Sequence, residues 1–216
     1  MWIKICGLTE ASAIDAALQG GADAIGFVFA PSVRRIEPGK AALLATVARG
    51  RAALIAVTLH PTQQQVDEII SVVRPDMLQA DLADFEHLTL PGSLARLPVV
   101  RGSGSGMPDG NEMPDDRDRS RYLTRLLFEG ARSGSGEVSD WRAAIEWART
   151  RELILAGGLH ANNVAEAIAT VRPFGVDVSS GVEEAPGRKH PEKIAQFIAK
   201  ARDAFRRESH GNRSVG

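Results

Sequence analysis

The chain has 216 residues, a hydrophobic fraction of 44% and a formal net charge of −1, from 26 Lys and Arg against 27 Asp and Glu. This length suits one domain around a sizeable core, and the balanced charge argues against a nucleic-acid partner. The single cysteine excludes an intrachain disulfide. No apolar run approaches the ~18 residues of a membrane span, and the N-terminus lacks the pattern of a signal peptide. We therefore expect a cytoplasmic enzyme with no nucleic-acid or membrane partner.

Short apolar runs alternate along the chain with longer amphipathic segments. The sequence predicts strands at residues 2–5, 24–29, 53–59, 77–79, 97–101, 123–129, 152–156 and 176–178. It predicts helices at residues 10–20, 38–49, 62–73, 140–149, 161–171 and 190–205. The residues expected to begin helices are Thr9, Pro38, Thr62, Asp140 and Pro191.

Near-continuous apolar strands that alternate with helices favour a parallel sheet covered by helices. Eight such units favour a closed barrel, so the predicted fold is α/β, a single (βα)8 TIM barrel over residues 1–205. Residues 80–95 are too short and too interrupted by proline for a full helix. Residues 102–121 contain many charges, and we expect a surface loop in place of the fifth helix, with one helical turn near 115–121. We expect residues 206–216 to form a flexible tail.

Two glycine-rich loops follow the last two predicted strands, L-A-G-G-L at 155–159 and S-S-G-V at 179–182. Such loops bring several backbone N–H groups together without side chains in the way, which is how a protein holds a phosphate without a lysine. The last two βα loops are where (βα)8 barrels commonly bind phosphate. The sequence therefore predicts a small phosphorylated substrate.

Side chains alternate along a strand, so polar residues of one parity should point into the barrel mouth. This places Lys4 and Cys6 inward on the first strand and Glu129 inward at the end of the sixth. By the same test Asp177 and Asp81 face the mouth. A lone cysteine is usually a small buried hydrophobe. At a strand end beside a lysine it is instead a candidate reactive thiol, because the ammonium favours the thiolate.

Arg34 follows the second predicted strand and can hold a ligand carboxylate with a bidentate pair. The five histidines and the single cysteine show no spacing typical of a metal site, so no metal is predicted. No Walker loop and no strand–G-x-G-x-x-G–helix unit is present, and no cofactor is expected.

Several motifs together resemble the phosphoribosylanthranilate isomerase family of tryptophan biosynthesis. They are K-I-C-G-L-T at 4–9, S-V-R-R-I-E-P at 32–38, S-G-S-G-E-V-S-D-W at 133–141, L-A-G-G-L at 155–159 and D-V-S-S-G-V-E-E-A-P-G at 177–187. The resemblance covers essentially residues 2–200. It implies a (βα)8 barrel without cofactor or metal. The implied reaction is the Amadori rearrangement of N-(5-phosphoribosyl)anthranilate to 1-(o-carboxyphenylamino)-1-deoxyribulose 5-phosphate.

The resemblance also implies roles for individual residues. Cys6 falls on the family's catalytic base and Glu129 on its catalytic acid, which protonates the furanose ring oxygen. Arg34 falls on the arginine that holds the anthranilate carboxylate, and Asp177 on the aspartate near the substrate amine. The phosphate-binding positions fall on Ser135, Gly136, Gly157, Gly158, Ser179, Ser180 and Gly181. We expect Lys4 to favour the thiolate of Cys6, and partial burial to keep Glu129 protonated.

Two departures from the family pattern lie at the mouth. Glu129 stands where the family usually has aspartate, and Asp81 stands where it has histidine, so the two changes can compensate each other. A barrel isomerase acting on the histidine-pathway aminoaldose is an alternative, but those enzymes have aspartate where this chain has Cys6. A non-catalytic phosphometabolite-binding protein is the second alternative. The chain is expected as a monomer or homodimer.

Overall fold

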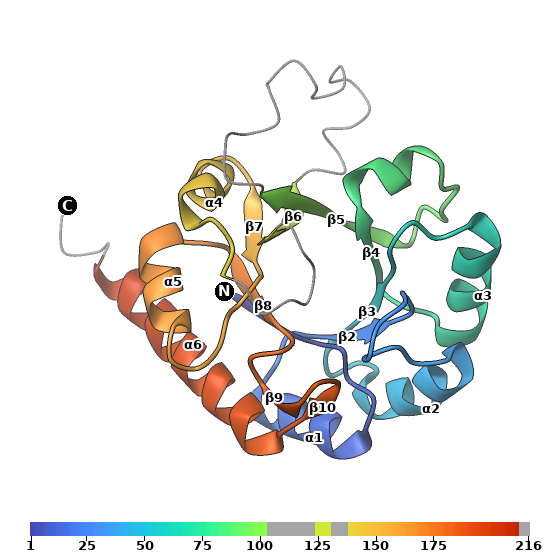
Figure 1. Ribbon diagram of the computed structural model, residues 1–216, viewed down its shortest axis with the longest axis horizontal. Coiled ribbons are helices and arrows are strands. Elements are labelled where there is room, and N and C mark those ends of the chain that lie inside the picture. Colours follow the sequence, from blue (N-terminus) through green and yellow to red (C-terminus); the bar gives the residue numbers. More distant parts are fainter. Residues whose placement is uncertain (103–123, 131–137, 212–216) are drawn as a thin grey trace.

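Figure 1 shows a closed barrel of parallel strands inside a ring of helices, which confirms the predicted fold. The computed structural model describes residues 1–102, 124–130 and 138–211. The barrel strands are β1 (Trp2–Cys6), β2 (Ala24–Val28), β3 (Ala53–Val57), β4 (Met77–Asp81), β5 (Ala95–Gly102), β6 (Arg125–Gly130), β7 (Glu152–Leu155) and β8 (Gly175–Val178). The α-helices are α1 (Ala11–Gly20), α2 (Pro38–Ala48), α3 (Gln63–Val73), α4 (Trp141–Ala148), α5 (Val164–Val171) and α6 (Pro191–Gly211).

Two of the predicted helix starts are confirmed by side chains that cap the first turn of the helix. Thr62 and Gln65 form a reciprocal capping box before α3. Asp140 accepts hydrogen bonds from two backbone N–H groups in the first turn of α4. The prediction at Thr9 was wrong, because α1 begins after Glu10 and has no side-chain cap. The packing of its buried face is enough to hold this helix.

The fourth unit has a short 3-10 helix, η1 (Leu82–Glu86), where no full helix was predicted. The predicted loop at 102–121 lies almost wholly outside the described residues. The C-terminal prediction needs a correction, because α6 continues past Phe205 to Gly211. An ion pair between Arg172 and Glu208 at 3.4 Å connects these extra turns to the end of α5. Among the described helices, none is long and apolar enough to cross a bilayer.

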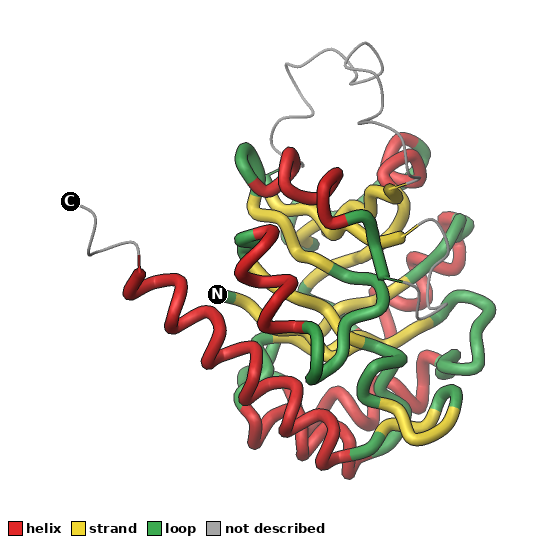
Figure 2. The backbone as a smooth tube through the Cα atoms, turned by 60° about the vertical axis from the view of Figure 1, so that its left-hand side comes forward, coloured by secondary structure: helices red, strands yellow, loops and turns green. Residues whose placement is uncertain are grey.

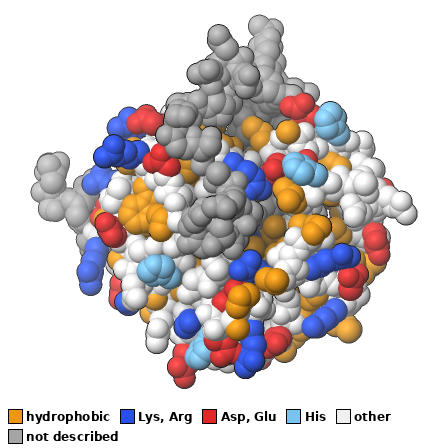
Figure 3. All heavy atoms as spheres, viewed as in Figure 1, with side chains coloured by type: hydrophobic (Ala, Val, Ile, Leu, Met, Phe, Trp, Pro, Cys, Tyr) orange, Lys and Arg blue, Asp and Glu red, His pale blue; other side chains and the backbone are white. Residues whose placement is uncertain are grey.

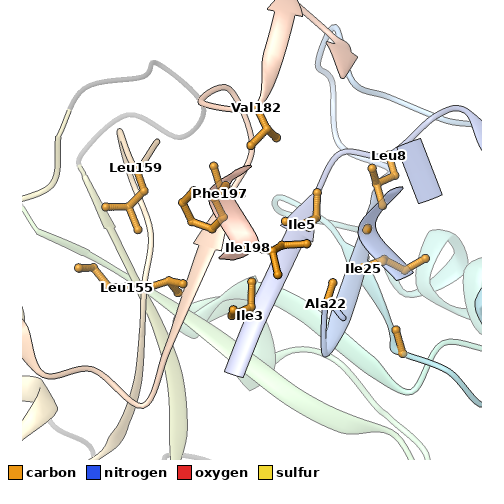
Figure 4. Close-up of a cluster of buried hydrophobic side chains, with 14 of the residues drawn as sticks. Ile3, Ile5, Leu8, Ala22, Ile25, Leu155, Leu159, Val182, Phe197 and Ile198 are labelled. Carbon is orange, nitrogen blue, oxygen red and sulfur yellow. The ribbon is translucent and has the colours of Figure 1, made fainter. Parts of the chain in front are cut away.

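Two layers of apolar side chains hold the barrel, as the alternation predicts. The outer layer lies between the strands and the helices, where Ile3 and Ile5 of β1 are in the same buried cluster as Phe197 and Ile198 of α6 (Figure 4). Figure 2 shows the helices outside the strands, with α6 as the long helix that leads to the C-terminus. The inner layer fills the barrel itself and consists of Trp2, Ala24, Ile55, Leu97, Val99, Leu127, Ile154 and Ala156. This packed interior leaves only the strand ends open to a ligand.

A short antiparallel hairpin after β8 was not predicted. It consists of β9 (Glu183–Ala185) and β10 (Arg188–Lys189), and its turn contains Gly187 with a φ of 81°. A Cβ at Gly187 would lie 2.6 Å from the carbonyl oxygen of Val33, so the hairpin packs closely on the loop after β2. The hairpin therefore brings Glu183 and Lys189 to the barrel mouth, beside Arg34.

Candidate active site

The carboxyl ends of the barrel strands surround a cavity of about 190 Å³. Among its lining residues are Cys6, Arg34, Gln79, Arg101, Glu129, Gly157, Gly158, Asp177, Ser179 and Ser180. Figure 3 shows acidic and basic side chains close together near the middle of the face seen in Figure 1. The cavity brings together most of the residues predicted for the site, at the end of the barrel where active sites of this fold lie.

Lys4 and Asp177 form a buried ion pair directly beneath Cys6. The two residues are register partners across β1 and β8, and the Nζ atom of Lys4 lies 3.0 Å from Oδ1 of Asp177. Lys4 has no exposed surface. Burial would lower the pKa of Lys4, but Asp177 and then Cys6 outweigh it, so the pKa is raised and Lys4 stays charged. Gly26 makes room for Lys4 and Cys6, because a Cβ there would lie 3.1 Å from both Cys6 Sγ and Lys4 Cε.

Opposing effects act on the pKa of Cys6. Burial raises the pKa of the Cys6 thiol, and Asp177 raises it further. Lys4 and Lys189 lower it, as expected for nearby cations, but by less than burial raises it. Burial therefore has the largest effect on the pKa of Cys6, and Lys4 moderates that effect without reversing it.

Arg34 lies where the sequence places it, but its guanidinium already has a carboxylate partner. Its Nε and Nη2 atoms donate to the two oxygens of Glu183 at 2.7 and 3.0 Å. Gly7 permits this position, because a Cβ at Gly7 would lie 2.8 Å from Arg34 Cδ. Glu183 also accepts from Lys189 at 2.7 Å. Burial alone would raise the pKa of Glu183, but hydrogen bonds from Arg34 and Lys189 lower it to about 2.

Lys189 is a site residue that sequence reasoning missed. Its Nζ atom donates to the carbonyl oxygen of Ser179 at 2.9 Å and to the Ser179 hydroxyl at 3.1 Å. That hydroxyl in turn donates to the carbonyl oxygen of Cys6 at 3.2 Å. Burial lowers the pKa of Lys189, against the opposing effects of Glu183 and Cys6. Lys189 thus connects the β9–β10 hairpin to Ser179, and Ser179 connects the loop after β8 to the strand that carries Cys6. No local sequence signal indicates these contacts.

Glu129 is buried, as the sequence predicts, and it has a cation partner that was not predicted. Nη1 of Arg101 donates to its Oε1. A cation in contact favours the ionised carboxylate. The same guanidinium holds Asp81 with Nη2 at 2.7 Å and Nε at 3.4 Å. Asp81 does not line the cavity itself. Arg101 was not predicted, although alternation from Leu97 and Val99 on β5 points to it.

The two predicted phosphate-binding loops lie side by side. Gly157 and Gly158 have φ values of 89° and 64°, in the left-handed region that favours glycine. A Cβ at Gly181 would lie 1.9 Å from the carbonyl oxygen of Leu159, so the loop after β8 packs against the loop after β7. Gly181 therefore shapes the loops and does not line the cavity, unlike Ser179 and Ser180. Two other predicted phosphate residues, Ser135 and Gly136, lie outside the described residues.

A (βα)8 barrel with a cysteine, two acids and paired glycine loops in one cavity at its strand ends defines an enzyme of acid–base chemistry. The family model for N-(5′-phosphoribosyl)anthranilate (PRA) isomerase matches residues 3–200. The chain therefore belongs to this family, and it is an isomerase of tryptophan biosynthesis.

Individual relatives agree with the family match. The N-(5′-phosphoribosyl)anthranilate isomerase of Rhizobium rhizogenes is 39% identical over 206 residues, which is 91% of each chain. The crystal structure of phosphoribosyl anthranilate isomerase from Thermus thermophilus has a TM-score of 0.78 at 30% identity and covers 94% of this chain and 99% of that one. A structure of the isomerase in complex with reduced 1-(o-carboxyphenylamino)-1-deoxyribulose 5-phosphate has a TM-score of 0.73 at 29% identity, with the same coverage.

Proposed function

We propose that Cys6 and Glu129 are the base and the acid with which this enzyme rearranges N-(5-phosphoribosyl)anthranilate to 1-(o-carboxyphenylamino)-1-deoxyribulose 5-phosphate. The single observation that carries the assignment is that both side chains line one cavity, Cys6 at the end of β1 and Glu129 near the end of β6. A sugar ring between two such groups can receive a proton on one side and lose one on the other.

The reaction proceeds in three steps. Glu129 donates a proton to the furanose ring oxygen, and the C1′–O bond breaks to give an open-chain protonated Schiff base. The Cys6 thiolate then removes the proton from C2′, which leaves a neutral enolamine. To form the ketone, C1′ gains a proton and the C2′ hydroxyl loses one. Glu129 has given up one proton and Cys6 has taken up one, so both return to their starting states by proton exchange with water. The acid and the base must be in opposite protonation states at one pH.

The ends of the substrate are held by other residues. Arg34 binds the anthranilate carboxylate. Because Lys189 also neutralises Glu183, the Arg34 guanidinium can bind a second anion besides Glu183. Asp177, held by Lys4, lies next to the substrate amine. The side-chain oxygen of Gln79 is buried in the cavity lining with no hydrogen-bond partner among the described residues, so it can accept from a sugar hydroxyl.

The phosphate is bound by the loops after β7 and β8. Gly157 and Gly158 allow close approach of the backbone, while Ser179 and Ser180 offer hydroxyls and N–H groups on the other side. The family resemblance implies that Ser135 and Gly136 also bind the phosphate. No cofactor is required. The enzyme acts in the cytoplasm as a monomer or homodimer; the relative from Thermotoga maritima is described as dimeric.

The assay follows the loss of substrate fluorescence. Cys6→Ser should lower kcat by at least ~10³-fold, because an alcohol is a far weaker base than a thiolate, and Glu129→Gln by at least ~10²-fold, because an amide cannot donate the proton. Glu152→Gln, which removes a carboxyl at the opposite end of the barrel, is the control and should keep full activity. Circular dichroism shows whether each variant folds. A fully active, folded Cys6→Ser or Glu129→Gln variant would disprove the corresponding role.

The pH dependence gives a second test of Cys6. Because burial raises the pKa of the thiol, kcat/KM should increase with pH along its lower limb. Lys4 opposes burial, so Lys4→Met should move that limb to higher pH. A limb that stays in place in Lys4→Met would remove Lys4 from the mechanism.

A further inference from the structure

Three charged residues from three neighbouring strands form one unit at the rim of the cavity. Asp81 ends β4, Arg101 lies near the end of β5, and Glu129 lies near the end of β6. Arg101 and Glu129 are register partners, so the backbone itself holds them opposite each other. The guanidinium divides its donors, with Nε and Nη2 on Asp81 and Nη1 on Glu129.

The unit is largely shielded from water. The side chains of Asp81, Arg101 and Glu129 are 19%, 27% and 11% exposed. At this burial a change of one charge strongly affects its neighbours. The trio contains two carboxylates and one cation, so with both acids ionised its formal charge is −1. Protonation of one carboxyl makes it neutral.

Other titratable groups face the unit from the elements around it. His60, in the loop after β3, lies with Nε2 3.9 Å from Oδ2 of Asp81, and its Nδ1 lies 2.9 Å from Asp84 of η1. Across the cavity lie Cys6 and Asp177. On the other flank of β6, the cavity-lining residues 156–159 of the loop after β7 carry no charge. Arg101 and Asp81 are therefore the charged side chains of the described rim that are linked directly to Glu129 or to each other.

We propose that Asp81 and Arg101 are a positioning pair that makes Glu129 usable as an acid: Arg101 aims its carboxyl, and Asp81 shares the charge of Arg101 so that Glu129 can be protonated. The proposal rests on the assignment of Glu129 as the acid. Both residues act on the reaction through Glu129.

The physical reason lies in the division of the guanidinium. If Glu129 faced the full charge of Arg101 alone, it would stay ionised and could not donate a proton. Asp81 accepts hydrogen bonds from both Nε and Nη2 of Arg101, so the guanidinium remains paired when Glu129 becomes neutral. Without Arg101, Asp81 and Glu129 would repel each other. The repulsion favours the protonated form of Glu129, but the Glu129 carboxyl loses the hydrogen bond that orients it.

The two single variants should therefore shift the titration of Glu129 in opposite directions. Asp81→Asn removes the competing carboxylate, and the upper limb of kcat/KM should move to lower pH by about one unit. Arg101→Gln removes the cation, and the limb should move up by a similar amount, with a fall in kcat. Arg101→Lys keeps the positive charge but lacks the several donors of the guanidinium. Its upper limb of kcat/KM should therefore lie near the wild-type pH, while only part of kcat is recovered.

A measurement without turnover separates this proposal from the acid assignment. The carboxyl resonances of ¹³C-glutamate-labelled protein are titrated by NMR, and Glu129→Gln identifies the Glu129 signal. Arg125→Gln is the matched control, because Arg125 is a β6 arginine paired with Glu152 away from the mouth. It should leave the Glu129 titration unchanged.

Each outcome has one reading. Opposite shifts of the Glu129 resonance in Asp81→Asn and Arg101→Gln support the positioning pair. Shifts in the same direction, or none, overturn it even if Glu129→Gln is inactive. If Glu129→Gln keeps wild-type activity, the acid assignment fails, and the NMR shifts then still report whether the pair controls this carboxyl.

Discussion

Glu183 offers a sharp test of the electrostatics at the mouth, because its carboxylate is shared by Arg34 and Lys189. Its pKa lies at about 2 against an ordinary value of 4.5, a difference of about 2.5 units. At ~1.36 kcal/mol per unit this corresponds to at most about 3.4 kcal/mol. Water at the open mouth screens part of the interaction, so Glu183→Gln should lower the free energy of unfolding at pH 7 by on the order of 1–2 kcal/mol.

The sign of the pH dependence follows from the lowered pKa. A carboxyl with a lowered pKa in the folded state stabilises the protein above its unfolded pKa, and the effect disappears as pH falls through the folded pKa. The difference between wild type and Glu183→Gln should therefore be full at pH 7 and narrow between pH 4.5 and about 2.

The measurement is urea unfolding followed by circular dichroism at several pH values. Glu184→Gln is the matched control, because Glu184 is the next residue and pairs with Arg188, whose side chain is 68% exposed. It should change the stability by less than about 0.5 kcal/mol. If Glu183→Gln behaved like Glu184→Gln at pH 7, or if its deficit persisted unchanged at low pH, the reasoning about the shared carboxylate would be refuted.

Three further outcomes are expected. Gly181→Ala should abolish competitive inhibition and thermal stabilisation by inorganic phosphate, because its Cβ would lie 1.9 Å from a backbone oxygen, whereas Gly92→Ala, with open space around it, should not. Gln79→Leu should raise KM while leaving stability unchanged or higher, since it removes a buried oxygen that has no hydrogen-bond partner among the described residues; an unchanged KM would exclude contact with substrate. Phe197→Ala should lower the free energy of unfolding by about 3–5 kcal/mol in urea, and a loss below ~1 kcal/mol would contradict its place in the core.

Much of the site could be predicted because the strands of a closed barrel all present their carboxyl ends to one mouth. Side-chain alternation along β1, β6 and β8 was enough to predict that Cys6, Glu129 and Asp177 face a common cavity. All three line that cavity in the structure. The glycine loops after β7 and β8 could be predicted to lie side by side, because consecutive strands are neighbours in the barrel. The roles of these residues in the reaction stay predictions until the variants are measured.

The protonation of the site could not be predicted in this way. Whether Glu129 meets water, apolar atoms or a cation depends on the neighbouring strand, and Arg101 is its register partner on β5. The net shift at Cys6 likewise depends on how far burial exceeds the effect of Lys4 and Lys189. The net effect on each group adds contributions from residues that are distant in sequence. No local sequence pattern indicates which contribution is larger.

Hydrophobic periodicity, side-chain alternation and helix caps act over a few residues, and they were enough to predict the barrel, its strand order and several residues of its mouth. Which charges meet at that mouth depends on the closed fold. Arg34 and Glu183 are 149 positions apart, and they pair because the β9–β10 hairpin packs on the loop after β2. Coulombic interaction depends on distance in space and on burial, and both are set only when the chain has closed into the barrel.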